Sequence, residues 1–131
     1  MTTKYVYPAI FEKEDCGYSV YFPDVEGCVT SGTTLAEAIE AAQDALCLML
    51  YDMEEQKEQT PAASDISAVQ CGENQFCSLI DCDTMDYRKF YDKKAVKKTL
   101  TIPSWLNTMA EREEINFSAV LQKALRAELN I

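Results

Sequence analysis

The stretch KAVKKTLTIPSW, residues 94–105, decides how the last third of the chain folds. Its side chains alternate between two faces, as they do along a β-strand. One face carries Val96, Lys98, Leu100 and Ile102, and the other carries Lys97, Thr99 and Thr101. Proline cannot donate a hydrogen bond to a sheet but suits the first turn of a helix, so Pro103 ends the strand. The pattern predicts a strand that leads directly into helical sequence.

Two helices are predicted after this strand. SWLNTMAEREE (104–114) is a short one, and Asn116 is a good N-cap for FSAVLQKALRAEL (117–129). The second helix has an apolar stripe made of Phe117, Val120, Leu121, Ala124, Leu125 and Leu129. Units below about 40 residues rarely bury enough surface to fold alone, and a lone strand has two unpaired edges. We therefore expect residues 95–131 to pair with a second copy across a two-fold axis.

Two paired strands form a ribbon that fits the major groove of DNA. Three outward side chains are then placed to contact base edges: Lys97, Thr99 and Thr101. Contacts to phosphate are expected from Lys98 and from the backbone amides that open the second helix, those of Phe117 and Ser118. The alternative is that this segment is an edge strand of the preceding domain, kept soluble by its lysines.

Charge is distributed unevenly along the chain. The 131 residues carry a net charge of −10. Residues 1–86 contain 3 Lys+Arg and 17 Asp+Glu, a net charge of −14, whereas residues 87–131 contain 9 and 5, a net charge of +4. An acidic body followed by a basic tail suggests one cationic and one anionic partner. The sequence shows no membrane span and no signal peptide at its start, so a cytoplasmic protein is expected.

The cysteine and histidine content argues against a metal centre or an enzyme. Six cysteines occur without any C-x-x-C spacing, and the chain has no histidine. A zinc site is the more specific hypothesis for these cysteines, but buried cysteine usually behaves as a small apolar residue, and that interpretation is preferred. No metal or cofactor is predicted. Without histidine, Ser-His and Cys-His catalysis are excluded. A metal nuclease built from Asp24, Glu37, Glu40 and Asp44 is the remaining enzyme hypothesis, and surface charge explains these residues equally well.

The first third of the chain predicts an antiparallel meander. YVYPAIF (5–11), YSVYF (18–22) and CVTSG (28–32) read as strands that tight turns separate. Pro8 predicts that the first of them lies at an edge or bends. NQFCSLIDCD (74–83) reads as a strand that returns to the sheet later.

One long helix is predicted between the meander and the returning strand. Thr34 and Glu37 form a capping box at its start. Its apolar stripe is predicted to consist of Leu35, Ile39, Ala42, Leu46, Met49 and Met53. Glu54 and Glu55 read as a solvated helix end, and TMDYRKFYDKK (84–94) as a polar bridge to the tail.

Two parts of the chain resemble known families. KKTLTIPSWLNTMAEREEINFSAVLQKAL (97–125) resembles the ribbon-helix-helix domain of bacterial repressors and antitoxins. YPAIFEKEDCGYSVYFPDVEGCVTSGTTLAEAIEAAQDAL (7–46) resembles the N-terminal domain of HicB antitoxins, including "GYSVYFPD", the "GC" turn and "GTTLAEA". The resemblance implies an α+β fold in which residues 1–86 form a partial RNase-H-like antiparallel sheet with one long helix. Residues 87–94 would be a linker, and residues 95–131 a ribbon-helix-helix domain formed by dimerisation.

The resemblance also implies a function. HicB antitoxins bind and mask HicA, a small basic RNA-cleaving toxin, and repress their own operon by binding DNA as a homodimer or a higher even oligomer. The alternative is a ligand-sensing ribbon-helix-helix repressor without a toxin partner. One departure is that these domains often have glycine before the second helix, whereas Glu113 and Glu114 stand here. Carboxylates at this place would weaken operator binding.

The toxin-binding surface is expected in the acidic domain, because charge complementarity favours a basic partner. Asp24 and Glu26 lie in the turn PDVEG (23–27), from which carboxylates can project beyond the sheet. Tyr21 and Phe22 alternate across the sheet, so one of them is expected to provide an aromatic anchor. The alternative is that Asp24 and Glu26 only shape a tight turn.

Overall fold

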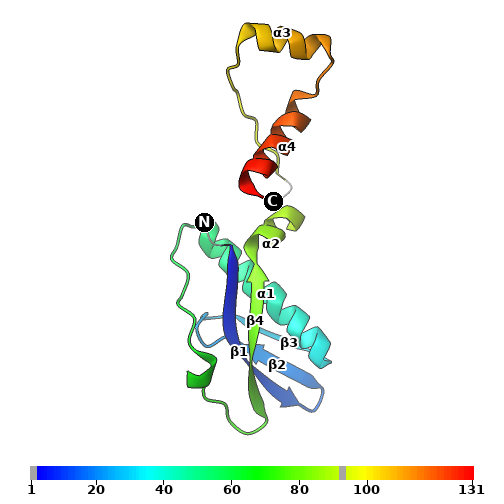
Figure 1. The fold of residues 1–131 in the computed structure, drawn as a ribbon. Helices are drawn as coiled ribbons and strands as arrows, with labels where there is room; N and C mark the ends of the chain where they lie inside the picture. The colour runs from blue at the N-terminus through cyan, green and yellow to red at the C-terminus, as the bar shows by residue number, and fades with distance from the viewer. Residues whose placement is uncertain (1–2, 92–93) are drawn as a thin grey trace. The chain divides into compact units, whose positions relative to one another are not determined.

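The computed structural model describes residues 3–91 and 94–131, and the chain divides into two compact units, residues 1–94 and 95–131. The N-terminal unit contains a four-stranded antiparallel sheet (Figure 1). Its strands lie in the order β3-β2-β1-β4 and are β1 (Lys4–Glu14), β2 (Gly17–Tyr21), β3 (Val29–Gly32) and β4 (Gln75–Asp83). The predicted meander and the predicted returning strand are therefore confirmed, with a first strand longer than expected.

Pro8 lies in the middle of the sheet because β1 pairs with β2 and β4 along different parts of its length. Pairing with β4 runs from Lys4 to Glu12, whereas pairing with β2 begins only at Ile10. Pro8 pairs with Leu79 on one side and has no partner in β2 on the other. The predicted edge strand is wrong for β1 as a whole, but Pro8 stands where a single neighbouring strand is present, which is a position that tolerates proline.

Helix α1 (Leu35–Glu55) packs on one face of the sheet and encloses the core with it. Its fully buried residues are Ala38, Ala42, Leu46 and Leu50. Leu35 and Ile39, which the sequence pattern placed in the buried stripe, are 40% and 37% exposed. This part of the prediction is wrong because two small alanines, rather than the larger side chains, face the sheet and let the helix approach it closely.

The start of α1 is capped nearly as predicted. The backbone amide of Glu37 donates to Thr34 Oγ1 at 3.2 Å, which confirms the first half of the capping box. The Glu37 carboxylate does not return to Thr34 but accepts from the backbone amide and the hydroxyl of Thr33, one residue earlier. These bonds stabilise the ionised carboxylate, and the Thr33 hydroxyl is the main reason why the pKa of Glu37 is lowered.

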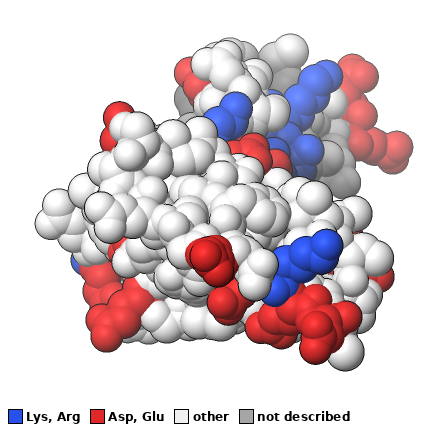
Figure 2. Space-filling model, turned by 90° about the horizontal axis from the view of Figure 1, so that it is seen from below, with Lys and Arg blue, Asp and Glu red and all other residues white. Residues whose placement is uncertain are grey.

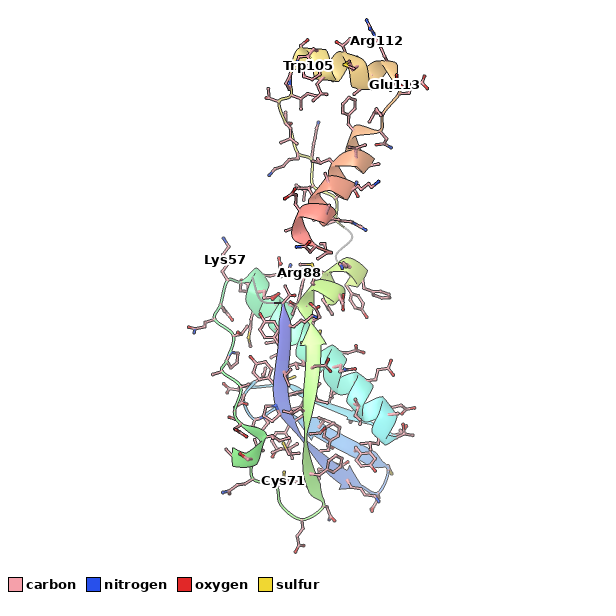
Figure 3. The ribbon with its side chains drawn as sticks, viewed as in Figure 1. Lys57, Cys71, Arg88, Trp105, Arg112 and Glu113 are labelled. Carbon is pink, nitrogen blue, oxygen red and sulfur yellow. The ribbon has the colours of Figure 1, made fainter. Side chains whose placement is uncertain are left out.

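A second helix, α2 (Thr84–Tyr91), replaces the polar bridge and most of the linker expected over 87–94. Side-chain contacts to α1 hold it in place. Arg88 forms ion pairs with Glu54, at 3.3 Å, and with Glu55, and its guanidinium lies 4.6 Å from the ring centre of Tyr51 (Figure 3). The linker prediction was wrong because these contacts join residues more than thirty positions apart, which local polarity does not reveal.

Glu54 is the centre of this network and not a solvated helix end. Its side chain is only 10% exposed. Its carboxylate accepts hydrogen bonds from Tyr5 Oη at 3.2 Å and Thr84 Oγ1 at 2.8 Å in addition to the Arg88 contact. It therefore joins β1, α1 and α2, and the earlier interpretation of Glu54 is corrected.

The connection from α1 to β4 crosses the N-terminal unit and contains one short 3-10 helix, η1 (Ile66–Ala68). Two contacts tie it down. Tyr7 Oη donates to the carbonyl of Pro61, and the Asp24 carboxylate accepts from the amide and hydroxyl of Ser64 at 2.8 and 2.6 Å. These bonds fix a segment that has little regular structure of its own.

The C-terminal unit contains α3 (Ser104–Arg112) and α4 (Phe117–Leu129). Asn116 caps α4, since its side chain accepts from the Ala119 amide at 3.0 Å, which confirms the predicted N-cap. Residues 94–103 have no regular secondary structure in the single chain. A strand requires a neighbour to which its backbone can bond, so the predicted strand remains a prediction about paired chains. No helix in the described part of the chain has the length and apolar character that crossing a membrane requires.

Gly32 determines how closely α1 follows β3, and its replacement gives a test of the fold. A Cβ atom added at Gly32 would lie 2.7 Å from the Cα of Ala38, in the first turn of α1. We expect Gly32→Ala to destabilise the chain by about 3 kcal/mol, because backbone has to move to admit the methyl group. Urea unfolding followed by circular dichroism measures this.

Gly72→Ala is the matched control, because the same atom there would meet only the Gln75 side chain, at 3.5 Å. Equal urea midpoints for the two variants would show that Gly32 does not determine how closely α1 packs on β3.

Candidate functional site

The candidate DNA-contacting residues all lie in the C-terminal unit and all are exposed. Lys97, Thr99 and Thr101 stand in the irregular segment 94–103, and Lys98 stands between them. Phe117 and Ser118 open α4. The single chain therefore presents these side chains to solvent without fixing their mutual geometry, because the ribbon that would fix it requires a second strand.

Helix α4 carries two basic residues, Lys123 and Arg126, that the sequence analysis missed. A shallow hollow of about 460 Å³ is lined by Asn116, Ser118, Ala119, Gln122, Lys123 and Arg126. Ser118 Oγ accepts from Gln122 Nε2 at 3.2 Å, one helical turn later. Lys123 and Arg126 lie in the second and third turns of α4 and line the same hollow as Ser118. Arg126 follows Ser118 by eight residues, and Lys123 precedes Arg126 by three, so helical spacing is the signal that could have identified them as candidate phosphate contacts.

The division into units changes the charge argument. Residues 95–131 contain 5 Lys+Arg and 4 Asp+Glu, a net charge of only +1, whereas residues 1–94 contain 7 and 18, a net charge of −11. Four of the nine basic residues counted in the tail belong to α2 and the residues after it. Any attraction of the C-terminal unit to an anion therefore depends on local groups such as Lys97 and Lys98, not on its net charge. On the face seen in Figure 2, carboxylates gather around an uncharged centre.

The turn between α3 and α4 contains Glu113 and Glu114, the two residues at which the sequence analysis noted a departure from ribbon-helix-helix domains. Glu114 adopts a φ of 54°, in the left-handed region that favours glycine. The amide of Ile115 bonds back to the carbonyl of Ala110 at 3.0 Å, so this conformation closes the end of α3. The turn keeps the shape that glycine would give it and adds a carboxylate.

Apolar side chains of the C-terminal unit are exposed in the single chain. No residue of α3 or α4 is buried. Trp105 projects from α3 and is 65% exposed (Figure 3). The other large apolar side chains that are at least about two-fifths exposed are Val96, Leu100, Ile102, Leu106, Met109, Ile115, Phe117, Val120, Leu125, Leu129 and Ile131. So many exposed apolar groups in 37 residues mark an interface that the single chain leaves uncovered.

The predicted toxin-binding residues occupy different environments in the N-terminal unit. Glu26 is exposed, whereas both carboxylate oxygens of Asp24 accept from Ser64. Tyr21 is 37% exposed, and Phe22 is in the core at 3%. Of the two aromatic candidates only Tyr21 is accessible, so Phe22 is corrected to a core residue. Asp24 has a structural task that the sequence did not reveal.

The carboxylates considered for a nuclease do not converge. Glu37 belongs to the helix cap, and Asp24 is bonded to the long connection. Within residues 3–91 and 94–131, no three cysteine, aspartate or glutamate side chains are grouped so as to hold a metal ion. The six cysteines are free thiols, of which Cys28 and Cys82 are buried. Burial raises the pKa of Cys28 to about 11.

Comparison with known proteins identifies the family. The model of the HicB-like antitoxins of bacterial toxin-antitoxin systems matches residues 7–125. The chain belongs to this family. The match runs from β1 into α4, so it covers most of both units of this HicB-like chain.

Individual relatives support the assignment over parts of the chain. Antitoxin HicB 2 of Photorhabdus laumondii is 38% identical over 58 residues, which are 44% of this chain and 42% of that protein. The HicB-like chain spans less than two thirds of the length of the curated relatives that it matches.

Solved structures support the fold over nearly the whole chain. A chain of a toxin-antitoxin complex from Streptococcus pneumoniae is 27% identical and superposes with a TM-score of 0.63, covering 95% of this chain and 99% of its own. A crystal structure of antitoxin HicB3 gives a TM-score of 0.53 at 24% identity, covering 95% of this chain and 97% of its own. The mixed α/β fold of the HicB-like chain, with its four-stranded antiparallel sheet and four helices, is thus the fold of HicB antitoxin structures.

Proposed function

We propose that this chain neutralises a small basic RNA-cleaving toxin of the HicA type and represses its own operon by binding DNA. The observation that carries the proposal is the family match over residues 7–125, which covers most of both units. It is supported by the likeness to a chain of the pneumococcal toxin-antitoxin complex along nearly the full length of both chains.

The N-terminal unit is assigned to the toxin. Its net charge of −11 suits a partner whose RNA-binding surface has to be cationic, because opposite charges speed the encounter and disfavour wrong partners. In this assignment the unit has the partial RNase-H-like form of such antitoxins and masks the toxin without doing chemistry itself. Glu26 and Tyr21 remain accessible candidates for contact with it.

The C-terminal unit is assigned to operator DNA and to pairing of chains. Its exposed apolar side chains, the capped helix α4 and the alternating segment 95–103 suit a ribbon-helix-helix domain completed by a second copy. Lys97, Thr99 and Thr101 would contact bases, while Lys98 and the start of α4 contact phosphates. The assembly is a homodimer or a higher even oligomer.

The direct test is to express the chain together with a HicA-type toxin and to measure RNA cleavage. We expect the two proteins to co-purify and cleavage to fall to the level without toxin at equimolar ratio, because the RNA-binding surface is covered. A variant with Lys97, Thr99 and Thr101 replaced by alanine should inhibit equally well, since these residues belong to the other unit. Undiminished cleavage at an excess of the unaltered chain would contradict the proposed function.

A further inference from the structure

A groove of about 880 Å³ lies in the N-terminal unit, away from the turn to which the sequence analysis assigned toxin binding. It is formed where the start of β1 and the end of β4 meet helices α1 and α2. β4 is an edge strand of the sheet. The groove is lined by Lys4, Tyr5, Val6, Gln43, Asp44, Cys47, Asp81, Cys82, Asp83, Asp86, Tyr87, Phe90 and Tyr91.

The lining combines negative charge with exposed aromatic surface. Of the described residues that line the groove, four are aspartates and one, Lys4, is basic. Phe90 and Tyr91 are 69% and 62% exposed, although aromatic side chains of this size are normally covered. Their rings lie 4.8 Å apart, and the rings of Tyr87 and Tyr91 lie 4.6 Å apart. The three rings make a continuous aromatic wall opposite carboxylates of β4 and α1.

Tyr87, one of the three rings of the wall, is fixed against α1. Tyr87 packs on Tyr51 of α1, with 5.0 Å between ring centres. Arg88, the next residue of α2, is bound by Glu54 and Glu55 of α1 (Figure 3). On the opposite wall, Gln43 Nε2 donates to Asp81 Oδ1 at 3.2 Å, and Asp83 Oδ1 accepts from the Met85 amide at 2.9 Å. Asp44 and Asp86 are both exposed. Unlike Asp81 and Asp83, neither carboxylate accepts a hydrogen bond from another residue in the described part of the chain.

We propose that this groove receives an arginine or lysine side chain from an exposed basic segment of the toxin. The inference rests on the proposed function and adds the place and chemistry of the contact. A guanidinium or ammonium group can bind to the faces of the aromatic rings and form ion pairs with the carboxylates at the same time. A neutral or acidic segment would not be favoured by this lining, because four carboxylates and a single lysine leave it with an excess of negative charge. The occupant is therefore a cationic protein segment.

The test compares two triple variants that change charge equally. Asp44→Asn, Asp86→Asn and Phe90→Ala alter the groove, whereas Glu40→Gln, Glu73→Gln and Leu48→Ala alter exposed residues outside it. We expect the groove variant to raise the Kd for the HicA-type toxin at least about tenfold, because it removes two carboxylates and an aromatic ring from one contact. The control variant should change it by less than about threefold, since long-range charge effects are the same in both. Isothermal titration of the full chain with toxin measures this, after thermal melting shows that both variants are folded.

Alkylation of cysteine provides a readout of position. Cys47 lines the groove, and its pKa is lowered mainly by the adjacent Cys82 thiol, so iodoacetamide should modify it in the free chain. Bound toxin should slow modification of Cys47 severalfold and leave the exposed Cys16, in the β1–β2 turn, unchanged. Equal Kd values for the two variants, or unprotected Cys47 in a complex that forms normally, would overturn the groove assignment and leave the proposed function intact. Failure of the unaltered chain to bind toxin would overturn both.

Discussion

The variant in which Lys97, Thr99 and Thr101 are replaced by alanine is expected to bind its operator about a thousandfold more weakly than the unaltered chain. Each lost base contact in the major groove costs about 1–3 kcal/mol, and about 1.4 kcal/mol corresponds to a factor of ten. The three side chains lie on one face of the alternating segment, so they are lost from the same surface. Gel-shift titration on the region upstream of the chain's own gene measures the effect.

Two controls separate base contacts from other causes. Lys57→Ala removes the same positive charge from the exposed turn that follows α1 and should leave operator binding unchanged. Thr99→Ala alone should alter sequence preference more than affinity for random duplex, because phosphate contacts carry no sequence information. An unchanged affinity of the triple variant would contradict the ribbon assignment. A loss that is equal on operator and random DNA would instead make these residues phosphate contacts.

Local patterns predicted most of the secondary structure of the N-terminal unit. Alternation of apolar and polar residues identified the four strands, and the Thr34 cap located the start of α1. These signals succeed because they are local: a helix cap acts within one helical turn, and the alternation along a strand repeats every two residues. The cap of α4 at Asn116 was predicted for the same reason.

What the sequence did not reveal depends on contacts between distant residues. The bonds from Asp24 to Ser64 and from Glu54 to Thr84 join positions 40 and 30 residues apart. Nothing in the local sequence distinguishes these two carboxylates from solvated ones such as Glu58. Helix α2 was missed in the same way, because its stability comes from Arg88 and Tyr87 packing on α1.

The buried face at the start of α1 was missed for a different reason. Periodicity gives the direction of a helix face only to within the width of its apolar stripe, and large side chains were assumed to face inward. Ala42 and Leu46 of the predicted stripe are buried, but at the start of the helix Ala38 faces inward in place of Leu35 and Ile39, because a close approach of helix and sheet there leaves room only for a small side chain. The groove beside β4 could not be predicted from local sequence patterns, because β1, β4, α1 and α2 all contribute residues to it.

Exchanging Leu100 for aspartate is expected to convert the assembly into single chains. In the alternating segment, Leu100 faces the same side as Val96 and Ile102, the side that would be covered by the second copy. Leu100 is 59% exposed in the single chain, so its replacement leaves the contacts within that chain largely unchanged. In a paired ribbon the same carboxylate would be buried against the apolar side chains of the second copy, and its loss of hydration costs more than such a small interface can supply. Light scattering should show the mass of one chain, and operator binding should be lost with it.

Thr101→Asp is the matched control, because it introduces the same charge one residue further along on the opposite face of the strand. It should keep the mass of the unaltered assembly and lose operator binding alone, since its carboxylate would point toward DNA. The pair of variants thus separates pairing of chains from contact with DNA. If Leu100→Asp kept the full mass, the exposed apolar side chains of the C-terminal unit would need a different partner, and the two-stranded ribbon would no longer explain them.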